Sequence, residues 1–557
     1  MMKKSLSKKL ALLLAGAMAV GMFAGCGSDN TEDTSGDTAN ATDNEDSGDA
    51  ESSGGGYTDY SGGFDETVTI QIPVYDRAFE GWDVTDNYYT KWVQSEFGEK
   101  YNVNVEYVAI GRTTEVQDYM QMIAAGTAPD IIMHYDMPQA VNYYNEGAMQ
   151  NLDYDELAYY APDFYEATKD AINTYGTLDG ENAFLFAGRN AIYYNYVTLI
   201  RQDWLDQVNM EMPTTLDELE EAAKAWKDAG LGKIGDQLID NSFTYFYGYL
   251  TDDQLSNEEE LAQYLDLNVA PFTWEPTKEY LQRRNQEYND GILDPEFYLN
   301  STSDTDWKAD FVAGNVGTYS FYISANTDVI SALLANDPDA KLSVLPTTVT
   351  ATGKGPYYEY PPYGMIMGIN SKTSDEERAA VYMYLNWLIQ PENLMKMQYG
   401  EEGKTYNLDE NGVAVPVTGY TGEEALSQNS NKDYYCLVQE MGVDYGSEEL
   451  NYQANLRTLA PEGYEYLVEE SYNYNKETEA DGIVTPVFTA TVESSSEYAT
   501  DLAAMWKEFY VDCITCAPDE FEALYEEYCQ EYLDGGYQEI LDEKAELYAD
   551  GQYISGN

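Results

Sequence analysis

The stretch Ala125-Gly-Thr-Ala-Pro-Asp-Ile-Ile132 decides the predicted fold class. A helical pattern over Gln117–Ala125 meets Gly126, a residue that commonly ends a helix. The apolar run Ala128–Met133 follows, and its length suits a buried strand. A helix that turns directly into a buried strand is typical of α/β proteins.

Two further strands are predicted upstream of this turn. Thr67–Val74 reads as a strand, Asn87–Tyr101 contains an amphipathic helix, and Tyr101–Val108 alternates as a second strand. Strand–helix–strand alternation predicts parallel units, and such sheets bind ligands beyond the carboxyl ends of their strands. The residues at these ends are Tyr75, Asp76, Arg77, His134, Tyr135 and Asp136.

The N-terminus has the pattern of a secretory signal peptide over residues 1–25. Four lysines precede the short apolar run Leu10–Val20. Phe23-Ala-Gly-Cys26 then resembles a bacterial lipobox, with Phe23 where leucine is usual. The resemblance implies cleavage before Cys26 and a lipid on its thiol. The alternative is an ordinary signal peptide with an incidental cysteine.

Residues 26–63 are expected to act as an acidic tether that follows the lipidated cysteine. Ten acidic residues and no Lys or Arg occur between Gly27 and Gly63, and apolar residues are nearly absent. Such a segment buries too little apolar surface to offset its ordering entropy. A flexible coil of this length spans roughly 35 Å.

The composition of the remaining chain limits its partners. The formal net charge is −71, and it becomes −75 when the four lysines of the signal peptide are removed. This charge argues against nucleic acid and against polybasic docking to a membrane, and it favours neutral over polyanionic ligands. Residues 64–557 are too many for one core, so two or more lobes are expected.

Two short motifs suggest metal binding, and neither is assigned. Cys513-Ile-Thr-Cys516 lacks the convergent ligands of a zinc site, since the only histidine, His134, is distant in sequence. Residues 300–306 alternate oxygen ligands, but they also suit a capped helix start before Trp307. We therefore predict no metal and no cofactor. Disulfide bonding is left open for Cys436, Cys513, Cys516 and Cys529.

A capped helix is predicted after Met212-Pro213. Thr214 or Thr215 caps it, and Glu218 supplies the capping-box carboxylate. Its apolar face comprises Leu216, Leu219, Ala222, Ala223 and Trp226.

The order of these segments resembles the family 1 extracellular solute-binding lipoproteins, the substrate-capturing subunits of ATP-driven sugar importers. The resemblance is carried by Ala125–Ile132, Arg201–Asp206, Met212–Leu219, Phe311–Tyr319, Gly364–Lys372, Asp375–Leu388 and Tyr399–Tyr406. It implies an α/β, two-lobed periplasmic-binding-protein-like fold of the class II type, with a ligand cleft between the lobes. The expected lobe 1 comprises 64–195 and 360–425, and lobe 2 comprises 196–359. A helical region, 426–557, is expected to pack on lobe 2 and the hinge.

The resemblance also implies a function without catalysis. The chain is expected to bind an oligosaccharide, to contact a pair of ABC-transporter permease subunits, and to remain on the extracytoplasmic face of the bacterial membrane as a lipid-anchored monomer. Two alternatives stay open, a surface glycoside hydrolase and a glycan-binding adhesin. A hydrolase needs only two facing carboxylates, and the 100 acidic residues make such pairs easy to imagine.

Sugar binding requires aromatic faces for stacking and polar groups for hydroxyls. The chain has 53 tyrosines against 16 phenylalanines, a bias that suits this chemistry. Arg77 has a surface ion pair as its alternative role, and Trp82 is an alternative stacking platform. The candidate ligand-binding residues are Tyr75, Asp76, Arg77, His134, Tyr135, Asp136, Arg189, Trp274, Tyr322 and Tyr363.

Overall fold

The computed structural model describes residues 56–189, 196–235, 248–265, 269–300, 304–322, 326–355, 361–427, 431–478 and 483–556. The chain divides into residues 1–54 and 55–557, and the fold below is that of the second unit. The predicted signal peptide, Cys26 and most of the predicted tether therefore lie outside the described residues.

The first hydrophobic core is built on the predicted strand–helix–strand unit. Strand β1 (Val68–Asp76) pairs in parallel with β2 (Val103–Gly111) over their whole lengths, which confirms the predicted unit. The connection consists of α2 (Tyr88–Val93), a π-helical turn η1 (Gln94–Gly98) and α3 (Glu99–Tyr101). Both strands alternate buried and more exposed residues along part of their length, as one-sided packing requires.

The third strand starts beside β1 but forms its ladders elsewhere. Helix α4 (Glu115–Ala125) ends at Gly126, whose φ of 71° is the left-handed conformation that favours glycine. Asp130 N–H then donates to Gln71 O at 3.0 Å. Strand β3 (Ile131–His134) pairs antiparallel with β10 (Tyr363–Ile369), which also pairs antiparallel with β6 (Leu185–Gly188). The expectation of parallel pairing throughout is therefore wrong for β3, because a strand some 230 residues later occupies that edge.

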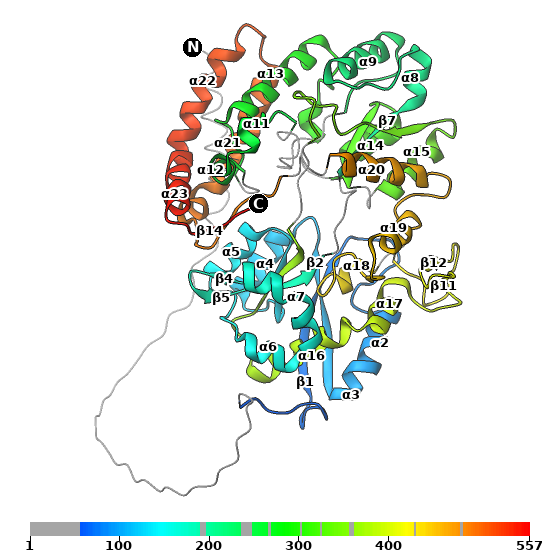
Figure 1. Cartoon of the computed structure of the whole chain (residues 1–557), viewed down its shortest axis with the longest axis vertical. Coiled ribbons are helices and arrows are strands. Elements are labelled where there is room, and N and C mark those ends of the chain that lie inside the picture. The colour runs from blue at the N-terminus through cyan, green and yellow to red at the C-terminus, as the bar shows by residue number, and fades with distance from the viewer. Residues whose placement is uncertain are drawn as a thin grey trace, which may run out of the picture. The chain divides into compact units, whose positions relative to one another are not determined.

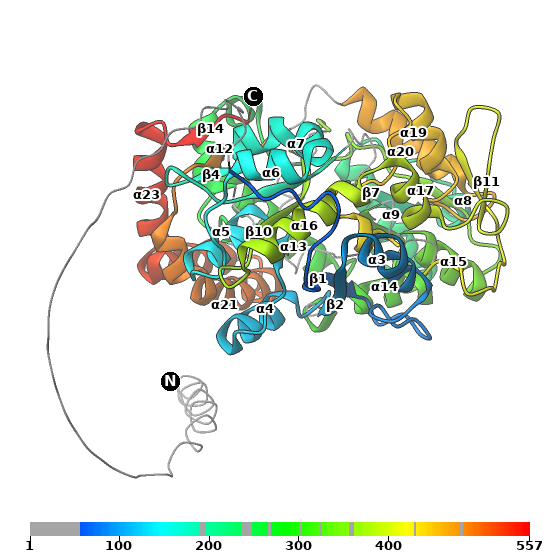
Figure 2. The same cartoon turned by 90° about the horizontal axis from the view of Figure 1, so that it is seen from below.

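Helices cover the first core. Helix α16 (Asp375–Leu388) begins at a capping box between Ser374 and Glu377. It packs against β1, α6 (Tyr154–Tyr160) and α7 (Pro162–Tyr175) (Figures 1 and 2). Helix α5 (Met137–Asn145) packs on β3 and β10, and α17 (Pro391–Tyr399) follows α16.

A second sheet organises the middle of the chain. Strand β7 (Tyr196–Arg201) lies between β8 (Thr318–Tyr322) and β9 (Leu342–Val344), and both pairings are antiparallel. The helices around it are α8 (Gln202–Val208), α9 (Leu216–Ala229), α14 (Asp304–Ala313) and α15 (Asn326–Asn336). Of the questioned 300–306 segment, residues 301–303 lie outside the described residues, and α14 begins at Asp304.

Helix α9 confirms the predicted cap and apolar face. The Thr215 side chain accepts a hydrogen bond from Glu218 N–H, and the Glu218 carboxylate accepts from the backbone and hydroxyl of Thr214. Leu219, Ala222, Ala223 and Trp226 are buried.

The C-terminal region is helical, as expected. It contains α18 (Lys432–Tyr435), α19 (Glu448–Leu456), α20 (Glu465–Glu477), α21 (Glu493–Thr515), α22 (Phe521–Tyr532), η5 (Leu533–Tyr537) and α23 (Gln538–Ala549). Residues 434–438 enter the first core, residues 459–468 pack beside β7, and residues 502–541 pack with α9 and α13 (Glu275–Asp290). Figure 1 shows α21 beside α13.

Short elements complete the described chain. They are β4 (Thr177–Leu178), β5 (Glu181–Asn182), α11 (Asp252–Leu255), α12 (Glu258–Tyr264), η2 (Phe297–Asn300), β11 (Tyr406–Leu408), β12 (Ala414–Pro416), β13 (Val487–Phe488) and β14 (Tyr553–Ile554).

The described residues show neither a metal centre nor a membrane span. Cys436, Cys513, Cys516 and Cys529 are all free thiols. Within the described ranges, no group of three or more His, Cys, Asp or Glu side chains is arranged to hold a metal ion. No described helix is both long and apolar enough to cross a membrane.

Candidate functional site

The ends of β1, β3 and β6 carry most of the predicted ligand-binding residues. A later segment, 431–440, joins two of these ends. Arg77, after β1, binds Asp433, while Gly188 N–H donates to Val438 O and Glu440 N–H donates to Gly188 O, both at 2.9 Å. We call the resulting cluster the strand-end site, and it comprises Tyr75, Asp76, Arg77, Arg112, Glu115, His134, Tyr135, Asp136, Arg189, Lys432, Asp433 and Glu440.

Two tyrosine rings and an arginine form the centre of the strand-end site. The rings of Tyr75 and Tyr135 stack with centroids 6.3 Å apart and an interplanar angle of 18°. The Arg112 guanidinium lies 5.0 Å from the first ring centroid and 5.6 Å from the second. Such cation–π contacts hold a ring in a fixed orientation.

The two hydroxyls of this stack differ in their hydrogen bonding. Tyr75 is fully buried, and its hydroxyl donates to the Glu115 carboxylate. The Tyr135 hydroxyl is also buried but has no hydrogen-bond partner among the described residues. Burial raises the pKa of both phenols well above the usual value, so both remain protonated donors at neutral pH. An unpaired buried hydroxyl is available to a ligand that brings an acceptor.

Glu115 is a buried carboxylate that contacts Tyr75, Arg112 and His134. It is 4% exposed, accepts from Arg112 at 3.0 Å, and lies 3.9 Å from His134 Nε2. Burial raises the pKa of this carboxyl, while His134 and Arg112 act against the rise. Our sequence analysis missed Arg112 and Glu115. The signal was present, because β2 runs parallel to β1, so its end must lie at the same edge.

His134 contacts both the backbone and the carboxylate of Asp136. His134 is 8% exposed, and its Nδ1 accepts the backbone N–H of Asp136 at 2.9 Å. The side chain of Asp136 is 45% exposed. Asp76 is also exposed, and its carboxylate accepts the backbone N–H of Ala78 at 2.8 Å.

Ion pairs join the strand ends to segment 431–440. Arg77 binds Asp433 through two hydrogen bonds of 2.8 Å, which matches the ion-pair alternative considered for this residue. Arg189 binds Glu440 at 2.5 Å, and Lys432 reaches the same carboxylate at 3.4 Å. Burial opposes ionisation of Glu440, but Lys432 and Arg189 outweigh it and hold its pKa below the usual range.

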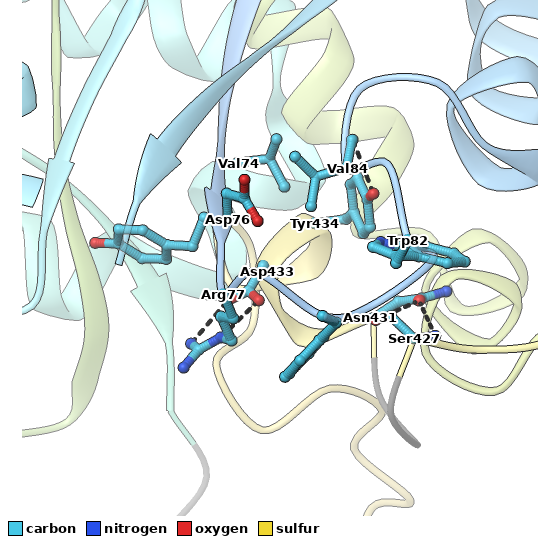
Figure 3. A pocket seen from close by; sticks show the side chains of 11 residues that line it. Val74, Asp76, Arg77, Trp82, Val84, Ser427, Asn431, Asp433 and Tyr434 are labelled. Carbon is cyan, nitrogen blue, oxygen red and sulfur yellow. Dashed lines mark hydrogen bonds and ion pairs between the residues drawn. The ribbon is translucent and has the colours of Figure 1, made fainter. Parts of the chain in front are cut away.

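A small pocket lies beside Arg77, between β1 on one side and Ser427 and residues 431–434 on the other (Figure 3). Trp82, the alternative stacking platform, lines it, and the Tyr434 hydroxyl fixes the opposite wall by donating to Val84 O at 2.9 Å. Figure 3 shows Arg77 turned toward Asp433. The lining residues are Val74, Tyr75, Asp76, Arg77, Phe79, Trp82, Val84, Ser427, Asn431, Asp433 and Tyr434.

Three predicted residues lie apart from this cluster or within cores. Trp274 is 3% exposed, stacks on Tyr264 at 5.4 Å and donates to Glu260 at 2.5 Å, so it has a packing role here. Tyr363 is the first residue of β10, is 4% exposed, and packs on Phe186. Tyr322 is the last residue of β8, and its side chain lies outside the described set.

Two comparisons of the sequence with known proteins each found a match. A family model described as bacterial extracellular solute-binding protein matches residues 92–401. The polygalacturonan/rhamnogalacturonan-binding protein YtcQ of Bacillus subtilis (strain 168) is 23% identical over 337 residues, which are 58% of this chain and 64% of that protein. The chain thus matches about 64% of the length of this curated relative.

Solved structures share the fold at low identity. The alginate-binding protein AlgQ2 without calcium ion has a TM-score of 0.61 at 18% identity, over 87% of this chain and 99% of that one. The same coverage applies to an HMO-binding, ABC-transporter-associated protein from Bifidobacterium longum infantis ATCC 15697, with a TM-score of 0.57 at 13% identity. It also applies to S. pneumoniae FusA in complex with kestose, at 0.56 and 15%. These likenesses confirm the predicted two-lobed α/β fold.

Proposed function

This chain belongs to the family of bacterial extracellular solute-binding proteins, and from that premise we propose that it captures an oligosaccharide for an ABC importer. The proposal includes a lipid anchor at Cys26 on the extracytoplasmic face of the bacterial membrane, and delivery of the ligand to permease subunits by a monomer without enzymatic activity.

The observation that carries the proposal is the chemistry gathered in the strand-end site. It combines the partly buried ring of Tyr135, which stacks on the buried ring of Tyr75, an unpaired buried hydroxyl and two solvent-accessible carboxylates at the ends of β1 and β3. Ligands of α/β sheets bind at such ends. Rings contact the C–H faces of sugars, while carboxylates accept from their hydroxyls. The names of the relatives, which refer to galacturonan, alginate and kestose, point to the same ligand class.

Capture is proposed to close one lobe onto the other. Lobe 1, comprising 64–195 and 360–425, carries most of the strand-end site, and lobe 2, comprising 196–359, supplies the opposing surface. Hinge closure around a ligand is a common transition of two-lobed proteins. Segment 431–440 supports this role, because its ion pairs to Arg77 and Arg189 fix the strand ends before a ligand arrives.

Thermal unfolding of a soluble form beginning at Gly27, with a panel of mono- and oligosaccharides, tests the proposal. A ligand at 100 times its Kd adds about 2.7 kcal/mol to the unfolding free energy. We expect one glycan to raise the Tm and to be recovered intact. Recovery of a shortened glycan would instead indicate the hydrolase. If no sugar raised the Tm, the oligosaccharide proposal would fail.

A further inference from the structure

Every arginine of the mature chain is already neutralised by a carboxylate. Outside the strand-end site, Arg201 binds Asp203 and Asp337, Arg283 binds Asp217 and Glu220, Arg284 binds Glu287, Arg378 binds Glu156 and Asp375, and Arg457 binds Asp409. Inside it, Arg77 is paired with Asp433, Arg112 with Glu115, and Arg189 with Glu440. Arginine is the side chain best suited to bind a carboxylate through two hydrogen bonds.

The undescribed internal segments add no cation to this balance. They comprise residues 190–195, 236–247, 266–268, 301–303, 323–325, 356–360, 428–430 and 479–482, and their sequences contain neither Lys nor Arg. Their sequences therefore supply no positively charged side chain that could bind an acidic ligand. The positive charges of the strand-end site are therefore those seen in the structure.

The strand-end site contains four cations and five carboxylates. The cations are Arg77, Arg112, Arg189 and Lys432, and each lies within 3.4 Å of an acidic oxygen. Of the carboxylates, Asp76 and Asp136 have no Lys or Arg partner among the described residues; Asp76 is exposed, and the side chain of Asp136 is 45% exposed. The nearest ring is that of His134, whose Nδ1 accepts the Asp136 N–H at 2.9 Å and lies 3.7 Å from the Asp136 carboxylate.

From this balance we propose that the site selects neutral oligosaccharides and rejects uronate-bearing ones, an inference that rests on the proposed function. A uronate would have to take an arginine from its partner, and the released carboxylate would then face the carboxylate of the ligand. Like charges at such short range disfavour binding. At physiological salt the Debye length is about 8 Å, so these local charges, rather than the total charge, decide the selection.

Asp76 and Asp136 are the residues that we assign to neutral sugars. Each offers an exposed carboxylate at the end of a strand, and a carboxylate that accepts from sugar hydroxyls forms charge-assisted hydrogen bonds. The same two carboxylates repel a uronate. The specificity therefore differs from that named for the galacturonan-binding relative.

Calorimetric titration with matched pairs of glycans tests this inference on the soluble form beginning at Gly27. The pairs are galactotetraose with tetragalacturonate, mannotetraose with a mannuronan tetramer, and xylotetraose with its glucuronate-substituted form. We expect one neutral member to bind at least 100-fold more tightly than its uronate partner. The Asp76→Asn/Asp136→Asn double variant should weaken neutral binding at least 10-fold and reduce the ratio, whereas Asp519→Asn, at an exposed position in a distant loop, should change neither.

The outcomes separate the two proposals. A uronate that binds as tightly as its neutral partner would leave the proposed function standing and overturn the inference. A neutral preference that persists unchanged in the double variant would overturn the assignment to Asp76 and Asp136. If neither member of any pair binds, the oligosaccharide proposal falls, and the selectivity falls with it.

Discussion

Two tyrosine hydroxyls in the strand-end site are expected to contribute unequally to stability. Tyr75→Phe removes the hydroxyl that donates to the buried carboxylate of Glu115. The loss should lower the unfolding free energy by about 1–3 kcal/mol, since a buried acceptor loses its partner. Tyr135→Phe removes a buried hydroxyl without a partner among the described residues, and it should change stability by less than about 0.5 kcal/mol. Urea unfolding of both variants measures the difference.

The two rings form one stack, so each variant is the control for the other. A second check uses Glu115→Gln, because the cost of Tyr75→Phe should be non-additive with the loss of its partner. Equal destabilisation by Tyr75→Phe and Tyr135→Phe would contradict the assigned hydrogen bonds. The ligand-binding experiment has the reverse expectation, because Tyr135→Phe should weaken glycan binding while the fold remains intact.

At the scale of elements, one asparagine joins two long helices. Asn285 in α13 is 3% exposed, and its Nδ2 donates to the carbonyls of Cys513 and Ile514 at 3.0 Å and of Cys516 at 2.9 Å. These carbonyls end α21 and lack partners within that helix. Asn285→Ala should therefore cost about 1–3 kcal/mol of unfolding free energy.

Asn289→Ala is the matched control for this helix contact. Asn289 lies one turn further along α13, is exposed, and reaches only one of these carbonyls, Cys516 O, at 3.2 Å. Chemical denaturation should show a clearly smaller loss than for Asn285→Ala. Similar losses from both variants would indicate that the end of α21 does not depend on the buried amide.

The loop 400–424 should show a pH-dependent contribution to stability. Lys404 and the Tyr420 hydroxyl bind the Glu424 carboxylate and lower its pKa from 4.5 to about 2. Because the folded-state pKa is depressed, the stabilising contribution is present above about pH 4.5 and is lost as the pH falls toward 2. The Tm difference between the wild type and Glu424→Gln should be constant from pH 5 to 8 and shrink below pH 4.5. A difference that grows on acidification would contradict this assignment.

Elements that depend on local pattern were predictable from the sequence, and pairings between distant segments were not. The cap at Thr215 and the turn at Gly126 need only neighbouring residues. In contrast, Asp433 lies 356 positions after Arg77, and nothing near either residue indicates the pairing. The antiparallel pairing of β10 with β3 was likewise not predictable, because the two segments lie far apart in the sequence. Trp274 resembled an exposed platform because its stacking partner, Tyr264, is not a sequence neighbour.

At the scale of the whole molecule, the C-terminal region links parts that the sequence separates. Residues 434–438 are buried with β1 and β3, whereas residues 502–541 are buried with α9 and α13. The ion pairs of Asp433 and Glu440 with Arg77 and Arg189 add charge contacts to the same connection. A segment late in the chain therefore contributes to the strand-end site. Domain boundaries drawn from sequence position alone would separate Arg77 and Arg189 from their ion-pair partners, Asp433 and Glu440.

In the proposed function, attachment of the chain to the membrane depends on the thiol of Cys26. Residues 27–63 contain no Lys or Arg, so no basic patch assists binding to anionic lipid, and one acyl chain alone gives only marginal attachment. Stable anchoring therefore requires a multiply acylated Cys26. We expect the wild-type protein to incorporate labelled palmitate and to sediment with membranes, and Cys26→Ala to lose the label and keep its signal peptide. Phe23→Leu, which restores the usual lipobox residue, should behave as the wild type. If the wild type were unlabelled, cleaved and released, and Cys26→Ala were cleaved and released as well, the segment would instead be an ordinary secretory signal.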